Sequence, residues 1–243
     1  MKKRMKKILA LSLCLGLVMN GTAYAQTGNA EKVETKAVEE STSEKGTEGA
    51  TSGVEINETN FPDANFREFV KQYDENGDDG LSEAEIAAVT KMDIDNRKIA
   101  DLTGINYFTA LIDLFCSGTK LTNLEISGLP ELTMLLCYDG QLNSLQVENL
   151  PKLKYLECEE NELTSLKVSN LPQLIDLYCY DNQLEKIELK ELPALELLRF
   201  SGNKLKSLEV SELPMLEMLD CSSNQLTNIE LSGLPELDRL LWK

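Results

Sequence analysis

Residues 156–177 read LECEENELTSLKVSNLPQLIDL, one copy of a motif that recurs every 21 residues. A Leu-Pro pair, such as Leu171-Pro172, keeps the same interval, and Phe200 takes the cysteine position in one copy. The cysteines at this position are Cys116, Cys137, Cys158, Cys179 and Cys221. A fixed period of this length predicts a solenoid, in which each repeat stacks on its neighbours instead of folding alone.

Each copy carries apolar residues at fixed distances from its cysteine. Counted from Cys158, leucine, isoleucine or valine occupies positions +5, +8, +10, +13, +16 and +19, with proline at +14. Alternation around the cysteine sends side chains inward from a short strand, and strands of successive repeats pair in parallel. Leu166 and Val168 leave open whether a second short strand forms on the convex return path. The predicted fold class is an α/β solenoid, a right-handed coil with a parallel concave sheet.

An asparagine follows the cysteine position by three residues in four successive repeats. Its amide can bond backbone groups of the tight turn that leaves the strand. These structural asparagines are Asn161, Asn182, Asn203 and Asn224.

The strand motif L-x-C-x-x-N-x-L resembles the leucine-rich-repeat consensus L-x-L-x-x-N-x-L, with cysteine in place of one leucine. Over residues 92–243 the short repeats are similar to those of bacterial surface proteins of the internalin-like kind. We expect about six units of 21–22 residues plus the start of a seventh at Leu240 and Trp242. The resemblance implies a helical, EF-hand-related cap before the repeats.

No polar capping unit follows Trp242, and three interpretations stay open. Trp242 acts as a lid, or the chain is a shortened relative of longer proteins, or this end docks on something. The last interpretation includes end-to-end self-association through the C-terminal repeat.

The N-terminus predicts secretion. Residues 1–7 carry five positive charges, residues 8–19 are apolar, and Ala23 and Ala25 supply small side chains for cleavage after Ala25. This pattern indicates a signal peptide over residues 1–25, since the apolar stretch is too short for a spanning helix.

The composition that follows the predicted signal peptide is also typical of an exported protein. Cys14 leaves a lipoprotein open, but Leu13 before it favours an unmodified cysteine. Residues 26–53, rich in Thr, Ser, Gly and Glu, predict a disordered acidic linker. Cleavage takes the formal charge from −17 to −22, because the removed segment carries five positive charges and no negative ones. We therefore expect no nucleic-acid partner, no membrane span in the mature chain, and a secreted or extracellular-surface location.

Residues 54–91 predict a small helical cap. Phe66, Phe69 and Val70 share one face of a first helix, and a second helix is expected over about 82–90.

Between these helices DENGDDGLSEAE, residues 74–85, resembles an EF-hand calcium loop. The resemblance implies Ca²⁺ as a cofactor. The implied ligands are Asp74, Asn76, Asp78, Gly80 through its carbonyl, Ser82 and Glu85. Position 6 requires a positive φ and carries Asp79 instead of glycine, which should weaken binding without abolishing it. A metal-free acidic turn is the alternative.

Three states are open for the five repeat cysteines: buried free thiols, disulfides and a metal ladder. Parallel in-register Cβ vectors converge poorly for disulfides, and zinc sites use tight C-x-x-C pairs that this chain lacks. Phe200 in the same column indicates that the position wants an apolar filler. Buried free thiols are therefore favoured.

The sequence offers little for catalysis and points instead to the outward positions of the concave sheet. It has no histidine, no Cys-His pair and no G-x-S-x-G, so we expect no enzyme. Large side chains on an exposed face with mixed charge are typical of recognition surfaces. The predicted ligand-binding residues are Phe115, Leu136, Tyr138, Tyr155, Glu157, Tyr178, Tyr180 and Arg199. They predict a protein or glycan partner, with adhesion as one role. A structural spacer or self-assembly unit is the alternative.

Overall fold

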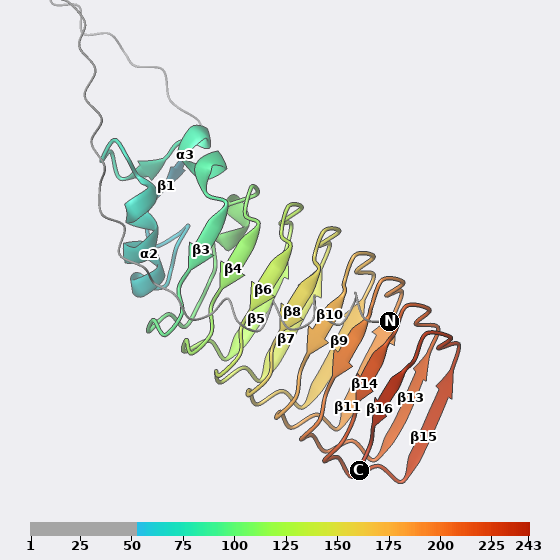
Figure 1. Cartoon of the computed structure of the whole chain (residues 1–243). Helices are drawn as coiled ribbons and strands as arrows, with labels where there is room; N and C mark the ends of the chain where they lie inside the picture. Colours follow the sequence, from blue (N-terminus) through green and yellow to red (C-terminus); the bar gives the residue numbers. More distant parts are fainter. Residues whose placement is uncertain (1–52) are drawn as a thin grey trace, which may run out of the picture. The chain divides into compact units, whose positions relative to one another are not determined.

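The computed structural model describes residues 53–243, which form a solenoid of short parallel strands behind a small helical cap (Figure 1). The predicted signal peptide and nearly all of the predicted linker lie outside the described residues. None of the helices in the described range is long and apolar enough to cross a membrane.

One eight-stranded sheet runs along the solenoid, and each repeat adds one strand to it. All its neighbours pair in parallel, and across β8 and β10 the register sets Leu156 opposite Leu177, one repeat apart. The strands are β3 (Lys91–Asp93), β4 (Asp113–Phe115), β6 (Met134–Leu136), β8 (Tyr155–Glu157), β10 (Asp176–Tyr178), β12 (Leu197–Arg199), β14 (Met218–Asp220) and β16 (Arg239–Leu241). The solenoid with a parallel sheet, predicted from the 21-residue period, is confirmed.

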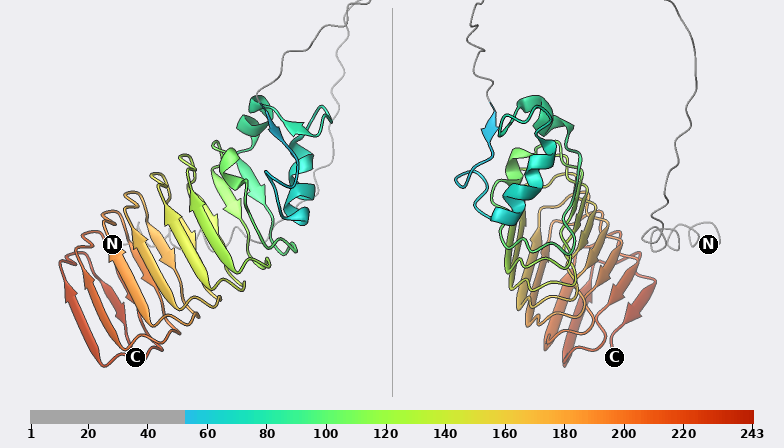
Figure 2. Two further views of the ribbon diagram at one scale, coloured as in Figure 1. Left: turned by 180° about the vertical axis from the view of Figure 1, so that it is seen from behind. Right: turned by 90° about the vertical axis from the view of Figure 1, so that its left-hand side faces the viewer.

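A second strand does form on the opposite side of each full repeat (Figure 2). These strands pair two by two, as β5 with β7, β9 with β11, and β13 with β15. They are β5 (Asn123–Ser127), β7 (Ser144–Glu148), β9 (Ser165–Ser169), β11 (Lys186–Lys190), β13 (Ser207–Ser211) and β15 (Asn228–Ser232).

Columns of equivalent apolar side chains fill the space between the two strand layers. Leu156, Cys158 and Leu163 are fully buried, and their equivalents from Leu114 to Cys221 lie in the same continuous core. Burying one leucine contributes about 1.5–3 kcal/mol, so a core that repeats this arrangement in every turn stabilises each unit through its neighbours.

The asparagine ladder links each repeat to the one before it. The Asn161 amide nitrogen donates to the carbonyls of Cys137 and Cys158 at 2.8 and 3.2 Å, and its side-chain oxygen accepts from the Leu142 backbone N–H at 2.9 Å. Asn182 repeats these bonds one unit later. Each buried amide therefore satisfies the backbone of two turns at once.

Each full repeat also places two residues in the left-handed region. One lies two residues after the cysteine position, as with Glu160 (φ 53°), and the other lies twelve after it. The second position holds Asn170 (φ 57°) but also Glu191 (φ 56°) and Glu212 (φ 58°).

The N-terminal cap combines short helices with a two-stranded sheet. Its elements are β1 (Val54–Glu55), α2 (Ala64–Val70), the 3-10 helix η1 (Lys71–Tyr73), β2 (Gly80–Leu81) and α3 (Glu83–Ala88), followed by the 3-10 helix η2 (Ile105–Tyr107). Phe61 packs edge-on against Phe66 and Tyr107, with ring centroids 5.8 Å apart in each pair. The aromatic side chains therefore join the cap to the first solenoid turn.

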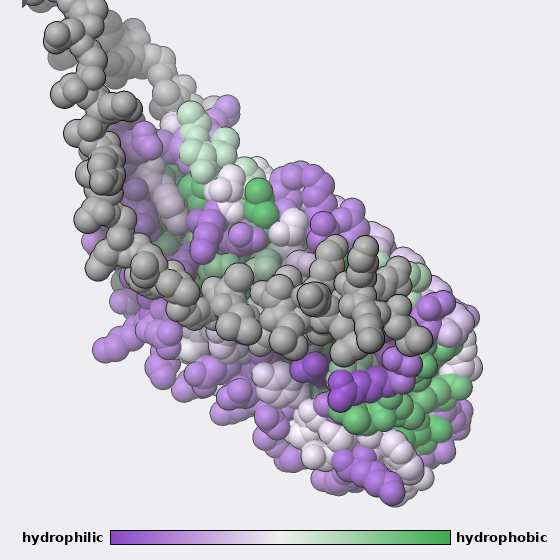
Figure 3. All heavy atoms as spheres, viewed as in Figure 1, coloured by the Kyte–Doolittle hydropathy of each residue, from purple (hydrophilic) through white to green (hydrophobic). Residues whose placement is uncertain are grey.

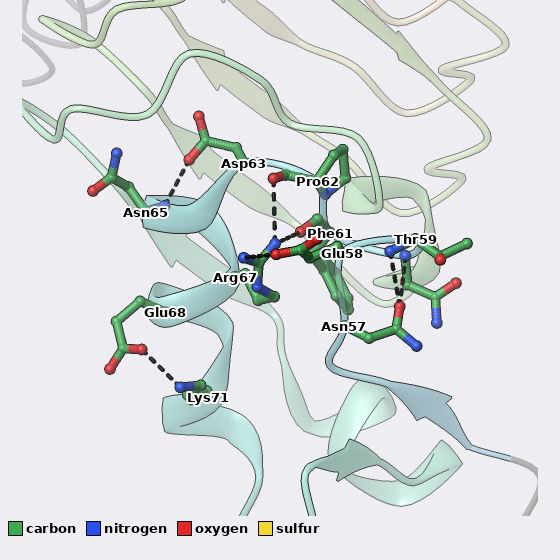
Figure 4. Close-up of polar contacts among 11 residues, drawn as sticks. Asn57, Glu58, Thr59, Phe61, Pro62, Asp63, Asn65, Arg67, Glu68 and Lys71 are labelled. Carbon is green, nitrogen blue, oxygen red and sulfur yellow. Dashed lines mark hydrogen bonds and ion pairs between the residues drawn. The ribbon is translucent and has the colours of Figure 1, made fainter.

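Polar contacts fix the start of α2 (Figure 4). Asp63 caps the helix by accepting from the backbone N–H groups of Asn65 and Phe66, and its other oxygen accepts from Ala100 N at 2.8 Å. Arg67 donates to the Phe61 carbonyl at 2.7 Å. One aspartate thus both begins the helix and ties it to the solenoid.

Candidate functional site

Strands β8 and β10, with the two residues that follow each of them, carry three acid–tyrosine pairs on the outer face of the long sheet, the face that the sequence predicts to be concave. Two pairs follow from the strand register, and the third is a hydrogen bond of 3.3 Å from a tyrosine hydroxyl to a glutamate oxygen. The pairs are Tyr155 with Asp176, Glu157 with Tyr178, and Glu159 with Tyr180. We call these six residues the acid–tyrosine patch.

Strand geometry sets the size of this patch. Alternate residues of one strand lie about 6.6 Å apart on the same face, and neighbouring strands lie about 4.8 Å apart. On this spacing, two residues of each strand and the outward residue two positions after its end cover about 13 by 5 Å. Each acid has a tyrosine across the strand pair, and Glu157 and Asp176 also have one two residues along their own strand, so carboxylates and aromatic rings face the same small area.

Glu159 is the most buried acid of the patch. It is only 6% exposed, and its Oε2 atom has no hydrogen-bond partner among the described residues. Burial, with a smaller contribution from the charge of Glu157, raises the pKa of Glu159 to about 7. A buried carboxylate that has an unpaired oxygen is costly, so this side chain favours either a proton or a nearby positive charge.

The other two acids are half-buried. Burial raises the pKa of Glu157, and burial together with the charges of Glu196 and Glu157 raises that of Asp176 to about 6. Neither Glu157 nor Glu159 forms an ion pair with any described residue. The patch therefore holds negative charge that the described part of the chain does not neutralise.

Arg199 lies at the edge of the patch, on β12. Its guanidinium carbon is 5.3 Å from the centroid of the Tyr178 ring, and its charge lowers the pKa of Asp176 against the effect of burial. Its Nε atom is buried without a hydrogen-bond partner in the described structure. The arginine thus stacks on one tyrosine of the patch beside one of its acids.

The remaining predicted face residues lie toward the cap. Phe115 is covered by Lys91, whose Nζ is 4.4 Å from the ring centroid, and Tyr138 is half-buried. Leu136 points to this face but is only 7% exposed, so it offers little contact area.

The 74–85 loop has several bonds that close it around Asp74. The carboxylate of Asp74 accepts from the backbone N–H groups of Gly77 and Asp79, at 2.7 and 3.0 Å. Asp79 adopts a φ of 62°, the left-handed conformation that the loop requires at its sixth position. Glu85 accepts from the backbone N–H of Glu75 at 2.8 Å and of Ser82 at 2.7 Å.

The predicted ligands thus follow one loop, but their acidic side chains are occupied by backbone donors. Within residues 53–243 no group of three or more His, Cys, Asp or Glu side chains is placed to hold a metal ion. An ionised carboxylate has about four lone-pair sites, so Asp74 and Glu85 could bind a calcium ion while still accepting from these backbone N–H groups.

The repeat cysteines lie in one inward column as free, buried thiols. Cys116 and Cys137 each donate from sulfur to a backbone carbonyl of the next repeat, both at 3.4 Å. Burial raises the pKa of Cys158 and of Cys179 well above its usual range. Protonated, enclosed thiols are poor nucleophiles, so the column acts as core filler.

Comparison with known proteins finds a relative that is similar over part of the chain. No protein-family model matches the chain. Over 68 residues it is 38% identical to internalin J of Listeria monocytogenes, a match that covers 28% of this chain and 7% of internalin J. The chain therefore resembles internalin J over part of its length. Its described residues form a solenoid of the leucine-rich-repeat type.

Two solved structures resemble this chain at low identity. The functional domain of internalin J from Listeria monocytogenes, described as including a cysteine ladder, is 24% identical with a TM-score of 0.41. That match covers 77% of this chain and 63% of the other. A leucine-rich-repeat protein of Leptospira interrogans is 23% identical with a TM-score of 0.46, over 67% of this chain and 51% of the other.

The C-terminal end of the solenoid exposes apolar side chains (Figure 3). Trp242 is 51% exposed, and Leu240 and Leu241 are each 38% exposed. Self-association through this end stays a prediction.

Glu159 and Asp176 are outside the residues predicted to bind a ligand, although the sequence places both on the outward face as acidic neighbours that bias it toward basic or neutral partners. The 21-residue offset sets Tyr155 beside Asp176 and Glu159 beside Tyr180. The burial of Glu159 has no such signal, since it depends on how neighbouring side chains pack.

Proposed function

We propose that this protein is an interaction module that recognises a protein partner at or beyond the bacterial cell surface through the outer face of its eight-stranded sheet. The observation that supports this proposal most is the acid–tyrosine patch. Its residues differ from one repeat to the next, whereas the core residues of the same strands repeat. Tyrosine combines a large ring with a polar tip and loses little rotamer freedom, so a few can dominate an interface.

A glycan partner could stack on the tyrosines, but it would make less use of the three acids than a basic protein surface would. Glu157, Glu159 and Asp176 bias the face toward basic or neutral partners, and basic groups are common on protein surfaces. The predicted alternative, a spacer or self-assembly unit, requires no chemistry from this patch.

The test is capture of partners from host and bacterial surface extracts by the mature chain and by the double variant Tyr155→Ala with Tyr178→Ala. Each true hot spot is worth about 2 kcal/mol or more, so the double variant should lose binding at least thirtyfold. Lys167→Ala, an exposed change on β9, is the control. A double variant with native circular dichroism and full affinity would favour the spacer instead.

We also propose that the 74–85 loop binds one calcium ion and stabilises the cap. Two observations support this: the left-handed Asp79 at the sixth position, and the pairing of Leu81 with Val54 of β1, which holds the loop without a second hand. When bound, the ion would supply a charge that organises the oxygens of Asp74, Asp78 and Glu85.

A ligand at a hundredfold excess over its Kd stabilises the folded state by about 2.7 kcal/mol. We expect calcium to raise the melting temperature, chelator to reverse this, and Glu85→Gln to remove the effect. Glu83→Gln, beside it on α3, changes the charge equally and serves as control. Absence of both binding heat and a melting shift would leave the metal-free acidic turn.

A further inference from the structure

We infer that the acid–tyrosine patch is an anchor site for an arginine side chain of the protein partner, seated against Glu157 between the rings of Tyr178 and Tyr180. This inference rests on the proposed function, and it names the chemistry that the recognition face selects. An arginine carries a planar cation that stacks on aromatic rings and bonds carboxylates, and the patch offers both kinds of group.

The first support is charge that lacks compensation. Glu157 and Glu159 have no ion-pair partner among the described residues, and Glu159 is 6% exposed with its Oε2 unpaired. Burial raises the pKa of both acids. An incoming cation would relieve this cost, which an uncharged partner would leave in place.

The second support is a contact that the chain already makes with itself. The Arg199 guanidinium stacks on Tyr178 at 5.3 Å and lowers the pKa of Asp176. One tyrosine–acid combination at the patch edge thus already accepts a guanidinium. Tyr178 also stands opposite Glu157, but Glu157 lies on β8 and Arg199 on β12, on the two sides of β10. Among the described residues neither Glu157 nor Glu159 has an ion-pair partner of its own.

The third support is that the two glutamates of the patch are buried to different extents. Glu157 is half-buried and open to direct contact, whereas Glu159 lies beneath the surface beside the Tyr180 hydroxyl, at 3.3 Å. Charge held in a poorly solvated position acts more strongly on a neighbour than charge in water. The patch, about 13 by 5 Å, fits one extended arginine side chain.

The experiment uses two peptides, acetyl-Gly-Arg-Gly-amide and its citrulline counterpart, which has the same shape without the charge. Binding to residues 26–243 is followed through the NMR signals of ¹³C-labelled tyrosine rings. We expect the arginine peptide to shift the signals of Tyr178 and Tyr180, with a Kd on the order of millimolar, and the citrulline peptide to leave them unchanged.

Variants then locate the effect. Glu157→Gln with Glu159→Gln keeps side-chain shape and should weaken arginine binding at least about tenfold. Glu209→Gln with Glu230→Gln changes the charge equally at an exposed pair on β13 and β15 and should have no effect. Equal shifts from both peptides, or equal losses in both double variants, would overturn the anchor.

The outcome also separates this inference from the proposed function. If the tyrosine double variant loses its captured partner while the arginine peptide fails to bind, the recognition face stands and the arginine anchor is wrong. Should the arginine peptide bind as expected, the anchor stands whichever partner is captured.

Discussion

The inner and outer faces of strands β8 and β10 follow opposite rules. Inside, the two strands present the same residues, Leu156 and Cys158 matching Leu177 and Cys179, and all four are fully buried. Outside, no position of one strand repeats in the other, and acids stand opposite tyrosines. A solenoid needs regular residues only where its repeats stack. The inner-face residues are therefore set by the fold, and the outer-face residues are free to differ between repeats.

The largest effect on stability should come from removing a side chain of the inner asparagine ladder, Asn182. Asn182→Ala removes the acceptor for Leu163 N–H and the donor to the Cys158, Cys179 and Tyr180 carbonyls. Leaving such buried groups unpaired should lower the free energy of unfolding by about 3 kcal/mol, measured by urea denaturation. Asn143→Ala, whose side chain is exposed, should cost less than about 0.5 kcal/mol. Equal losses would contradict the ladder's role.

An outer-face change should act through pH instead. The folded-state pKa of Glu159, about 7, lies above its ordinary value of 4.5, so the folded protein holds a proton that the unfolded chain has released. That contribution is complete below pH 4.5 and is lost as pH rises through 7. Glu159→Gln cannot ionise, so the variant should equal the wild type near pH 4.5 and exceed its stability at pH 8 by on the order of 2 kcal/mol.

Thermal or urea unfolding across this pH range measures the difference. Glu209→Gln, exposed on β13, is the matched control and should follow the wild-type curve. Parallel curves for the wild type and Glu159→Gln would mean that the pKa of Glu159 is the same in the folded and unfolded protein.

The smallest effect on stability should come from placing asparagine at a left-handed turn position that now holds glutamate. Glu191 occupies the left-handed turn position that Asn170 fills one repeat earlier. Asparagine tolerates this conformation better than glutamate, so Glu191→Asn should raise the free energy of unfolding by about 0.5 kcal/mol. Glu185→Asn, at an exposed position outside the left-handed region, should bring no gain. If both variants behave alike, turn strain at this position is negligible.

The fold was predictable because the repeat itself encodes it. A period of 21 residues predicts which side chains meet, and the pairing of Met92 with Leu114 shows that even the weak first repeat joins the sheet. The direction of outward residues was equally predictable, since alternation along a strand sets it.

Their exposure was not predictable. Leu136 and Glu159 both point to the outer face, yet they are 7% and 6% exposed. Alternation says which way a side chain leaves the backbone, whereas burial depends on the size and position of neighbouring side chains. The most unusual electrostatic feature of the candidate site therefore emerges only in three dimensions.

The two-by-two pairing of the rear strands divides the solenoid mechanically. In the described structure the long sheet is continuous, but β7 does not pair with β9, nor β11 with β13. Under load such a rod should flex at these two joints, while the block that contains β8 to β11 is tied both in front and behind. The acid–tyrosine patch lies on the front of that block, so its six side chains should keep their spacing when the rest of the molecule bends.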